Sequence, residues 1–204
     1  MTSQKADFDS PWKDILRAYF PQAIEFFFPD TAALVDWSIA HEFLDKEFQK
    51  IDRDGELGRR FADQLVKVWL KEGNPIYLLL HLEVQSQFDP NFSERMFTYC
   101  LRIFDLFRQF PVSLAILCDD NPHWRPHDFG FNYPNASLSF EFGIVKLLDF
   151  RDRWDELEAS QNPFATVAMA HLKTIETRPD DHERKGWKLR LIRGLYDKGY
   201  SRQD

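Results

Sequence analysis

The segment Ile76–Ser86 (IYLLLHLEVQS) constrains the fold most, because it places an acid and an amide, Glu83 and Gln85, at the end of an apolar run. Side chains in a β-strand alternate between the two faces of the sheet. One face therefore receives Leu78, Leu80 and Leu82. The other face receives Leu79, His81, Glu83 and Gln85. The sequence therefore predicts a strand whose final residues place polar side chains on one face of the sheet only.

A second strand is predicted just before this one. Phe61–Leu70 is rich in β-branched and aromatic residues, and Lys71–Pro75 is a cluster of turn-forming residues, so the two runs form a hairpin. If the turn consists of those five residues, counting outward places Asp63 directly opposite Glu83.

Two carboxylates in this position call for a positive charge between them. Directly opposed residues have Cβ atoms roughly 4.5–5.5 Å apart, and like charges at that distance destabilise a sheet. A divalent cation bound by Asp63 and Glu83 is one solution. Pairing of Glu83 with a lysine such as Lys67 or Lys71 is the alternative that does not involve a metal.

The order of these residues, Asp63 and then Glu83-Val84-Gln85 after a hairpin, resembles the PD-(D/E)XK nuclease superfamily, and within it the Rpn-type recombination-promoting nucleases and transposase-related proteins. The resemblance covers about residues 10–200. Its further motifs, in chain order, are Ser10–Lys13, Tyr19–Pro21, Glu42–Glu47, Leu57–Arg60, Leu65–Val68, Glu94–Met96, Arg102–Asp105, Trp124–Pro126, Phe140–Phe142 and Val145–Leu147.

The resemblance implies a fold and a chemistry. The fold is an α/β domain with a restriction-endonuclease-like core, in which helices flank a mixed β-sheet. The chemistry is cleavage of DNA by an Mg²⁺- or Mn²⁺-dependent endonuclease. Asp63, Glu83 and the backbone carbonyl of Val84 would hold the metal, and Gln85 would orient the attacking water. Glu47, on the helix before the hairpin, is a further acid that could touch metal-bound water or simply lie on a solvated helix face.

The sequence departs from the superfamily pattern at two positions. Ala62 precedes Asp63 where the superfamily name calls for proline, and Gln85 stands where it calls for lysine. Glutamine at that position is usual in the Rpn-like branch, but an amide cannot act as a general base. The alternative function is therefore a catalytically silent, transposase-derived protein that binds DNA or assembles with other proteins.

We expect residues 1–204 to form one domain, with N-terminal helices over 11–51, a core over 57–150 and a helical C-terminal region over 155–204. Helix periodicity covers Asp36–Ile51 and Asn91–Phe110. The predicted elements after the hairpin are the helix 91–110, an interior strand over 112–118 parallel to the strand 76–85, edge strands within 129–150, and helices over 162–175 and 181–196. On the helix 91–110, a side with Arg95, Tyr99 and Arg102 could clamp phosphate or make ordinary surface pairs.

Charge and composition bear on the partners. The chain has 26 Lys and Arg against 33 Asp and Glu, a net charge of −7, whereas proteins that bind DNA usually carry a basic surface. The predicted C-terminal helix within 181–204 is locally basic and could contact a phosphate backbone, or lie in solvent as an amphipathic helix. No apolar run is long enough to span a membrane and the N-terminus lacks a signal-peptide pattern, which predicts the cytoplasm. The sequence allows a homo-oligomer without specifying one.

Overall fold

The computed structural model of the chain describes residues 9–44, 46, 64–72, 77–177 and 199. Its centre is a five-stranded mixed sheet with the strand order β1-β2-β3-β4-β7. The strands of this sheet are β1 (Glu42–Phe43), β2 (Gln64–Trp69), β3 (Tyr77–Gln85), β4 (Val112–Leu117) and β7 (Gly143–Lys146). The helices that flank it are α1 (Asp9–Ala18), α2 (Phe20–Phe27), α3 (Pro29–Leu34), α5 (Phe92–Phe107), α6 (Trp154–Ala159) and α7 (Pro163–Glu176), with a 3₁₀ helix, η1, over Leu147–Arg153.

The predicted hairpin forms in the predicted register. Strands β2 and β3 are antiparallel, and their pairs run from Gln64 opposite Leu82 to Trp69 opposite Tyr77. The same register, continued by one residue, is the basis for placing Asp63 opposite Glu83. Asp63 itself lies outside the described residues, so its position stays a prediction.

The prediction of an interior parallel strand is confirmed. Strand β4 pairs with β3 in parallel from Leu80 opposite Val112 to Gln85 opposite Leu117, and α5 connects the two strands. Helix α5 ends where Arg108 adopts a left-handed backbone conformation with φ of 55°, three residues before Pro111. Because β7 is also parallel to β4, the carboxyl ends of three neighbouring strands meet at one edge of the sheet.

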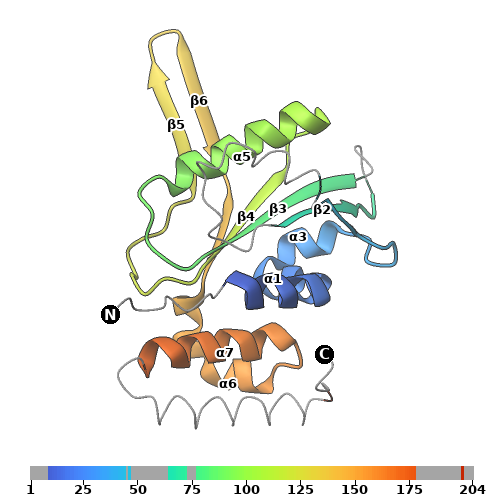
Figure 1. The fold of residues 1–204 in the computed structure, drawn as a ribbon, viewed down its shortest axis with the longest axis vertical. Helices are drawn as coiled ribbons and strands as arrows, with labels where there is room; N and C mark the ends of the chain where they lie inside the picture. Colours follow the sequence, from blue (N-terminus) through green and yellow to red (C-terminus); the bar gives the residue numbers. More distant parts are fainter. Residues whose placement is uncertain (1–8, 45, 47–63, 73–76, 178–198, 200–204) are drawn as a thin grey trace.

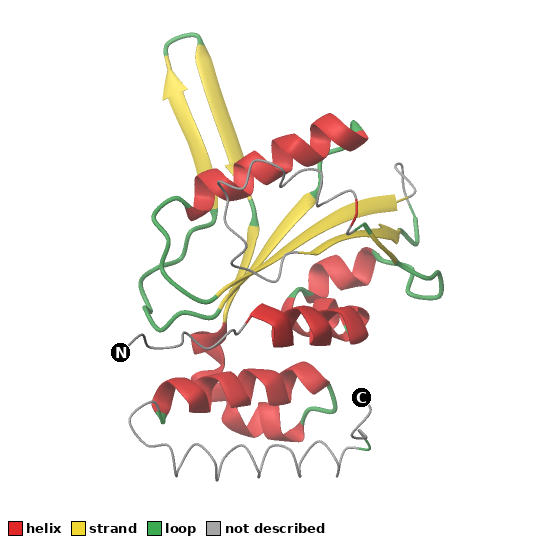
Figure 2. Cartoon of the chain, in the orientation of Figure 1, coloured by secondary structure: helices red, strands yellow, loops and turns green. Residues whose placement is uncertain are grey.

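The two faces of the sheet are covered differently, as Figures 1 and 2 show. Helix α5 lies over one face, while the N-terminal helices and α6 and α7 lie on the opposite side. The larger core forms on that opposite side and includes Leu80, Leu82 and Val84 of β3 packed with residues of α2 and α7. On the α5 side, Leu65 and Leu79 pack against Tyr99 and Ile103. The alternation predicted for β3 is therefore confirmed.

A second, two-stranded sheet extends from the α5 side (Figure 1). It consists of β5 (Asp128–Tyr133) and β6 (Ala136–Glu141), an antiparallel hairpin that packs at its base where the Phe129 ring stacks on Phe97 of α5. Gly130 is required there, because a Cβ at this position would meet the carbonyl oxygen of Leu138 at 2.3 Å. Edge strands within 129–150 were predicted, and β7 is the edge strand that joins the main sheet.

The helix predicted over Asp36–Ile51 is wrong in its first half. Residues 36–41 contain no helix, and Glu42 and Phe43 form β1, which pairs with β2. Trp37 and His41, two of the residues whose spacing predicts the helix, pack in an aromatic cluster instead, because their rings contact Phe20 together with that of Phe43. Residues 47–51 lie outside the described residues, as does the basic helix predicted over 181–196.

Candidate functional site

Glu83 and Gln85 end β3 on the face covered by α5. The strand is interior, with β2 on one side and β4 on the other, so both side chains are buried although both are polar. Burial of an uncompensated carboxylate is costly, and partners are therefore expected. These partners come from α5 and from the loop that precedes it.

The main partner of Glu83 is Arg95, in the first turn of α5. The Nη2 group of Arg95 donates to Glu83 Oε1 and also to Gln85 Oε1, at 2.8 Å from the latter. Its Nη1 group donates to Asp89 Oδ2, in the loop between β3 and α5. One guanidinium thus joins the strand end to the following loop. We name Glu83, Gln85, Asp89 and Arg95 the Arg95 cluster.

The two oxygens of Glu83 differ in their surroundings. Oε1 accepts from Arg95, whereas no described residue provides a hydrogen-bond partner for the buried Oε2. Burial raises the pKa of the Glu83 carboxyl, Arg95 opposes that rise, and the negative charge of Asp89 adds to it. The carboxylate is therefore only partly compensated, which makes it receptive to a further cation.

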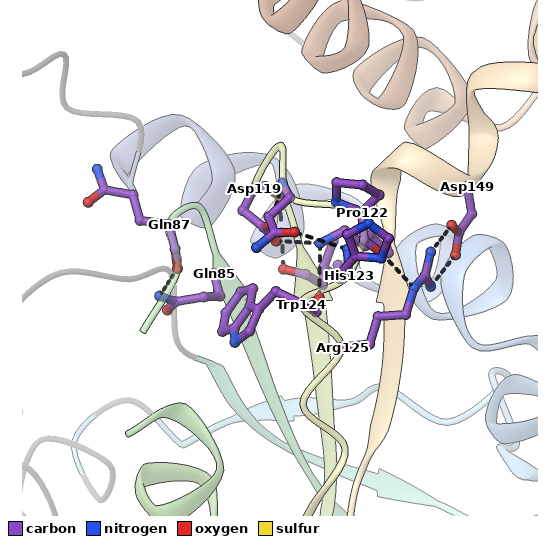
Figure 3. Close-up of polar contacts among 12 residues, drawn as sticks. Gln85, Gln87, Asp119, Pro122, His123, Trp124, Arg125 and Asp149 are labelled. Carbon is purple, nitrogen blue, oxygen red and sulfur yellow. Dashed lines mark hydrogen bonds and ion pairs between the residues drawn. The ribbon is translucent and has the colours of Figure 1, made fainter. Parts of the chain in front are cut away.

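Gln85 is held at both ends of its amide. Its Oε1 accepts from Arg95, and its Nε2 donates to the backbone carbonyl of Gln87 at 2.6 Å (Figure 3). The side chain consequently has a fixed orientation beside Glu83. An amide held in this way can position a water molecule but cannot accept its proton.

His81 precedes Glu83 by two residues on the same strand face. It is fully buried, and its ring centroid lies 5.1 Å from that of Tyr99. Burial, together with the positive charge of Arg95, lowers the pKa of His81 to about 3. The imidazole is therefore neutral in the folded protein at neutral pH.

This neutral histidine predicts an acid-sensitive fold. The unfolded state binds a proton on His81 below its ordinary pKa of ~6.5, whereas the folded state does not bind one until about pH 3. Stability should therefore fall as the pH drops through this window, by about 2 kcal/mol between pH 7 and pH 5 from His81 alone. Urea denaturation in EDTA across this range should show a shallower loss for His81→Leu. Parallel curves for the two proteins would contradict the assignment.

A second buried ion pair lies at the carboxyl ends of β4 and β7. Lys146, the last residue of β7, is buried and donates to Asp119 Oδ2 at 2.6 Å and to the carbonyl of Trp124 at 3.1 Å. Asp119 follows β4 and also accepts from the backbone N–H of Asn121 at 2.9 Å. The pair therefore fixes the start of the loop that leads from β4 to β5.

Figure 3 shows this loop beside Gln85. Its outer part is fixed by Arg125, whose Nη1 group donates to Asp149 Oδ2 at 2.9 Å. Its inner part presents Trp124, whose ring contacts Phe88 and Phe92. The Trp124 ring thus packs over the start of α5. Asp89 and Arg95 lie in the same part of the chain as Phe88 and Phe92, which the ring contacts.

The predicted site residues have different outcomes. Glu83 and Gln85 are brought together, as the strand alternation requires. Val84 lies between them with its side chain in the opposite core, so only its backbone carbonyl could serve as a ligand. Asp63 and Glu47 lie outside the described residues. Within the ranges that the structure describes, no three His, Cys, Asp or Glu side chains are grouped to hold a metal.

Arg95 has another role than the one predicted for it. The sequence places Arg95 on one side of the helix 91–110 with Tyr99 and Arg102, which predicts a phosphate clamp or ordinary surface pairs. Instead, Arg95 and Tyr99 point into the protein and only Arg102 is partly exposed. Met96, Cys100 and Ile103 follow helical spacing and predict the buried face of this helix, and Arg95, next to Met96, borders that face.

Asp89, Asp119 and Lys146 were not singled out as site residues. Asp119 follows the apolar run Leu114–Cys118, and Lys146 lies between Val145 and Leu147. A charged residue within or directly after a short apolar run was the signal. Their pairing could not be read from the sequence, because 27 positions separate them.

Together these features define a mixed α/β protein with two buried ion pairs at the carboxyl edge of its parallel strands. The chain matches no protein-family model, no curated protein and no solved structure. None of the helices in the described ranges is long and apolar enough to cross a membrane.

Proposed function

We propose that the protein is a metal-dependent DNA endonuclease of the PD-(D/E)XK type, related to the Rpn-type recombination-promoting nucleases and transposase-related proteins. The observation that carries the proposal is the end of β3. An acid and an amide, Glu83 and Gln85, are buried there side by side on one strand face, and Glu83 Oε2 has no hydrogen-bond partner among the described residues. Burial of a carboxylate oxygen without a hydrogen-bond partner destabilises the fold, and a functional role accounts for its presence.

The donor set suits a hard divalent cation. Mg²⁺ and Mn²⁺ prefer carboxylate and carbonyl oxygens, and Mg²⁺ keeps several of its waters. Glu83, the carbonyl of Val84 and, by the register of β2 and β3, Asp63 would supply the protein ligands. The bound ion would polarise a phosphodiester and lower the pKa of an attacking water.

The residues of the chain then have distinct roles in hydrolysis. Glu83 and Asp63 would hold the divalent cation close to the phosphate. Gln85 orients the attacking water through its amide. The new bond would join the water oxygen to phosphorus while the water gives up a proton to solvent. The bond from phosphorus to the leaving sugar oxygen would break, and the leaving oxygen would take up a proton from solvent.

A second candidate function is favoured by Arg95. Its guanidinium already supplies a positive charge to Glu83 Oε1, so the protein could keep the fold as a catalytically silent DNA-binding or assembly protein. The net charge of −7 is in keeping with this second candidate. Both candidates are compatible with the buried strand end, and activity separates them.

A plasmid-nicking assay tests the proposal. Purified protein with millimolar Mg²⁺ or Mn²⁺ should convert supercoiled plasmid to the open-circular form, and EDTA should stop the reaction. Asp63→Ala should lower the rate at least about 10²-fold, because it removes a proposed metal ligand. Nicking by the variant at the wild-type rate would exclude Asp63, and no nicking by either protein would favour the silent candidate.

A further inference from the structure

Arg95 joins the end of β3 to the loop that follows it through three polar contacts. Its Nη2 group bonds to the strand through Glu83 and Gln85, and its Nη1 group bonds to the loop through Asp89. The side chain is only 9% exposed, and that of Glu83 is fully buried. The guanidinium is thus a positive charge held next to the carboxylate that the proposed function needs.

The two strand contacts of Arg95 engage the two side chains on which the proposed chemistry depends. The Glu83 carboxylate would bind the metal, and Gln85 Oε1 would accept a hydrogen bond from the attacking water. Glu83 Oε1 and Gln85 Oε1 both accept from Arg95 Nη2. A divalent cation and a guanidinium repel each other strongly at this range in a buried site, so they do not share Glu83.

The loop contact gives Arg95 a place to remain when the strand contacts break. Asp89 is bonded through the other nitrogen, Nη1, and its side chain is 23% exposed, in contrast to buried Glu83. Nη2 can therefore leave the strand while Nη1 keeps its partner. The guanidinium also lies over the ring of Phe92, with Cζ 5.0 Å from the ring centroid. A small movement of Nη2 away from the strand would keep this ring contact.

We propose that Arg95 is an internal counter-ion that closes the site in the metal-free protein, and that it must leave Glu83 and Gln85 before a divalent cation binds. This inference rests on the proposed function. It makes Arg95 a positioning residue, with Asp89 as its alternative partner. It also requires metal binding by the wild type to be weakened, since the cation competes with a charge that is already in place.

Calorimetric titration with Mn²⁺ at pH 8, without DNA, tests the proposal. Arg95→Met removes the charge and keeps much of the side-chain volume, whereas Arg95→Lys keeps the charge. Arg102→Met is the matched control, because it changes the net charge equally from the same helix. We expect Arg95→Met to bind Mn²⁺ at least about tenfold more tightly than the wild type, and the other two variants to stay within about twofold.

The combination of Arg95→Met with Glu83→Gln identifies the binding site. It should abolish the gain, because the carboxylate that receives the cation is gone. Arg95→Met that binds Mn²⁺ no more tightly than the wild type overturns the counter-ion role, as does an equal gain in Arg102→Met.

A measurement on the wild type covers the case in which Arg95→Met does not fold. The Nη2 protons of Arg95, bonded to Glu83 and Gln85 in the metal-free protein, should lose their protection from solvent exchange when Mg²⁺ saturates the protein. Protection that is unchanged by saturating Mg²⁺ overturns the proposal.

The two proposals fail in different ways. The counter-ion role alone fails if the wild type nicks DNA and binds Mn²⁺ through Glu83, while Arg95→Met gains no affinity. The nuclease function alone fails if Arg95→Met gains Glu83-dependent affinity but no form of the protein nicks DNA.

Discussion

Lys146→Met is expected to lower the free energy of unfolding by about 3–5 kcal/mol, the range found when one partner of a buried ion pair is removed. The Lys146 side chain is fully buried and that of Asp119 is 3% exposed. Methionine fills a similar volume, so packing changes little. The loss comes from Asp119, whose carboxylate stays buried without its cation, and from the carbonyl of Trp124, which loses its donor.

Urea denaturation monitored by circular dichroism measures this loss. Lys13→Met, at an exposed position of α1, is the control for removal of a lysine charge and should change stability by less than about 0.5 kcal/mol. Addition of Asp119→Asn to Lys146→Met should recover much of the stability, because asparagine can still accept from the Asn121 N–H while the buried charge disappears. A Lys146→Met protein as stable as the control would show that the pair does not hold the loop.

The sequence predicted the hairpin well because its determinants are local. A five-residue turn cluster and the period of two in Ile76–Ser86 were enough to place Glu83 and Gln85 on one face. They were also enough to set the register of β2 against β3, which the pairs Gln64–Leu82 and Trp69–Tyr77 confirm. A shift of one residue would have moved every core side chain to the wrong face, so hydrophobic burial selects one register.

Long-range partners set the limit of what could be predicted. The spacing of Trp37, His41 and Leu44 fits a helix, but the rings of Trp37 and His41 contact Phe20, and residues 36–41 are not helical. Local propensity is a weak signal when the packing comes from another element.

The ion pairs show the same limit more clearly. Nothing near Glu83 in the chain indicates that its partner is Arg95 rather than Lys67 or Lys71. Lys67 lies over the rings of Trp69 and Tyr77, and Lys71 donates to the carbonyl of Ala33. Arg95 reaches Glu83 because the β3–α5–β4 crossover brings the first turn of α5 over the end of β3. Pairing of buried charges thus follows from topology, which the local sequence does not specify.

Glu83→Gln is expected to lower the nicking rate at least about 10²-fold while the protein remains folded. Glutamine has nearly the same shape, and its oxygen can still accept from Arg95, which also keeps Asp89 as a partner. The metal-free fold should therefore lose only about 1 kcal/mol, the net value of a typical hydrogen bond, as measured by urea denaturation in EDTA.

The matched control for this substitution is Glu94→Gln, which makes the same chemical change at an exposed position next to Arg95. It should nick plasmid and respond to Mn²⁺ as the wild type does. Thermal unfolding with and without Mn²⁺ provides the second readout, because a cation that binds only the folded state raises the melting temperature. That shift should be present in the wild type and in Glu94→Gln and absent from Glu83→Gln. Glu83→Gln that nicks at the wild-type rate and keeps the thermal shift would exclude Glu83 as a metal ligand, and the end of β3 would then be a structural ion pair alone.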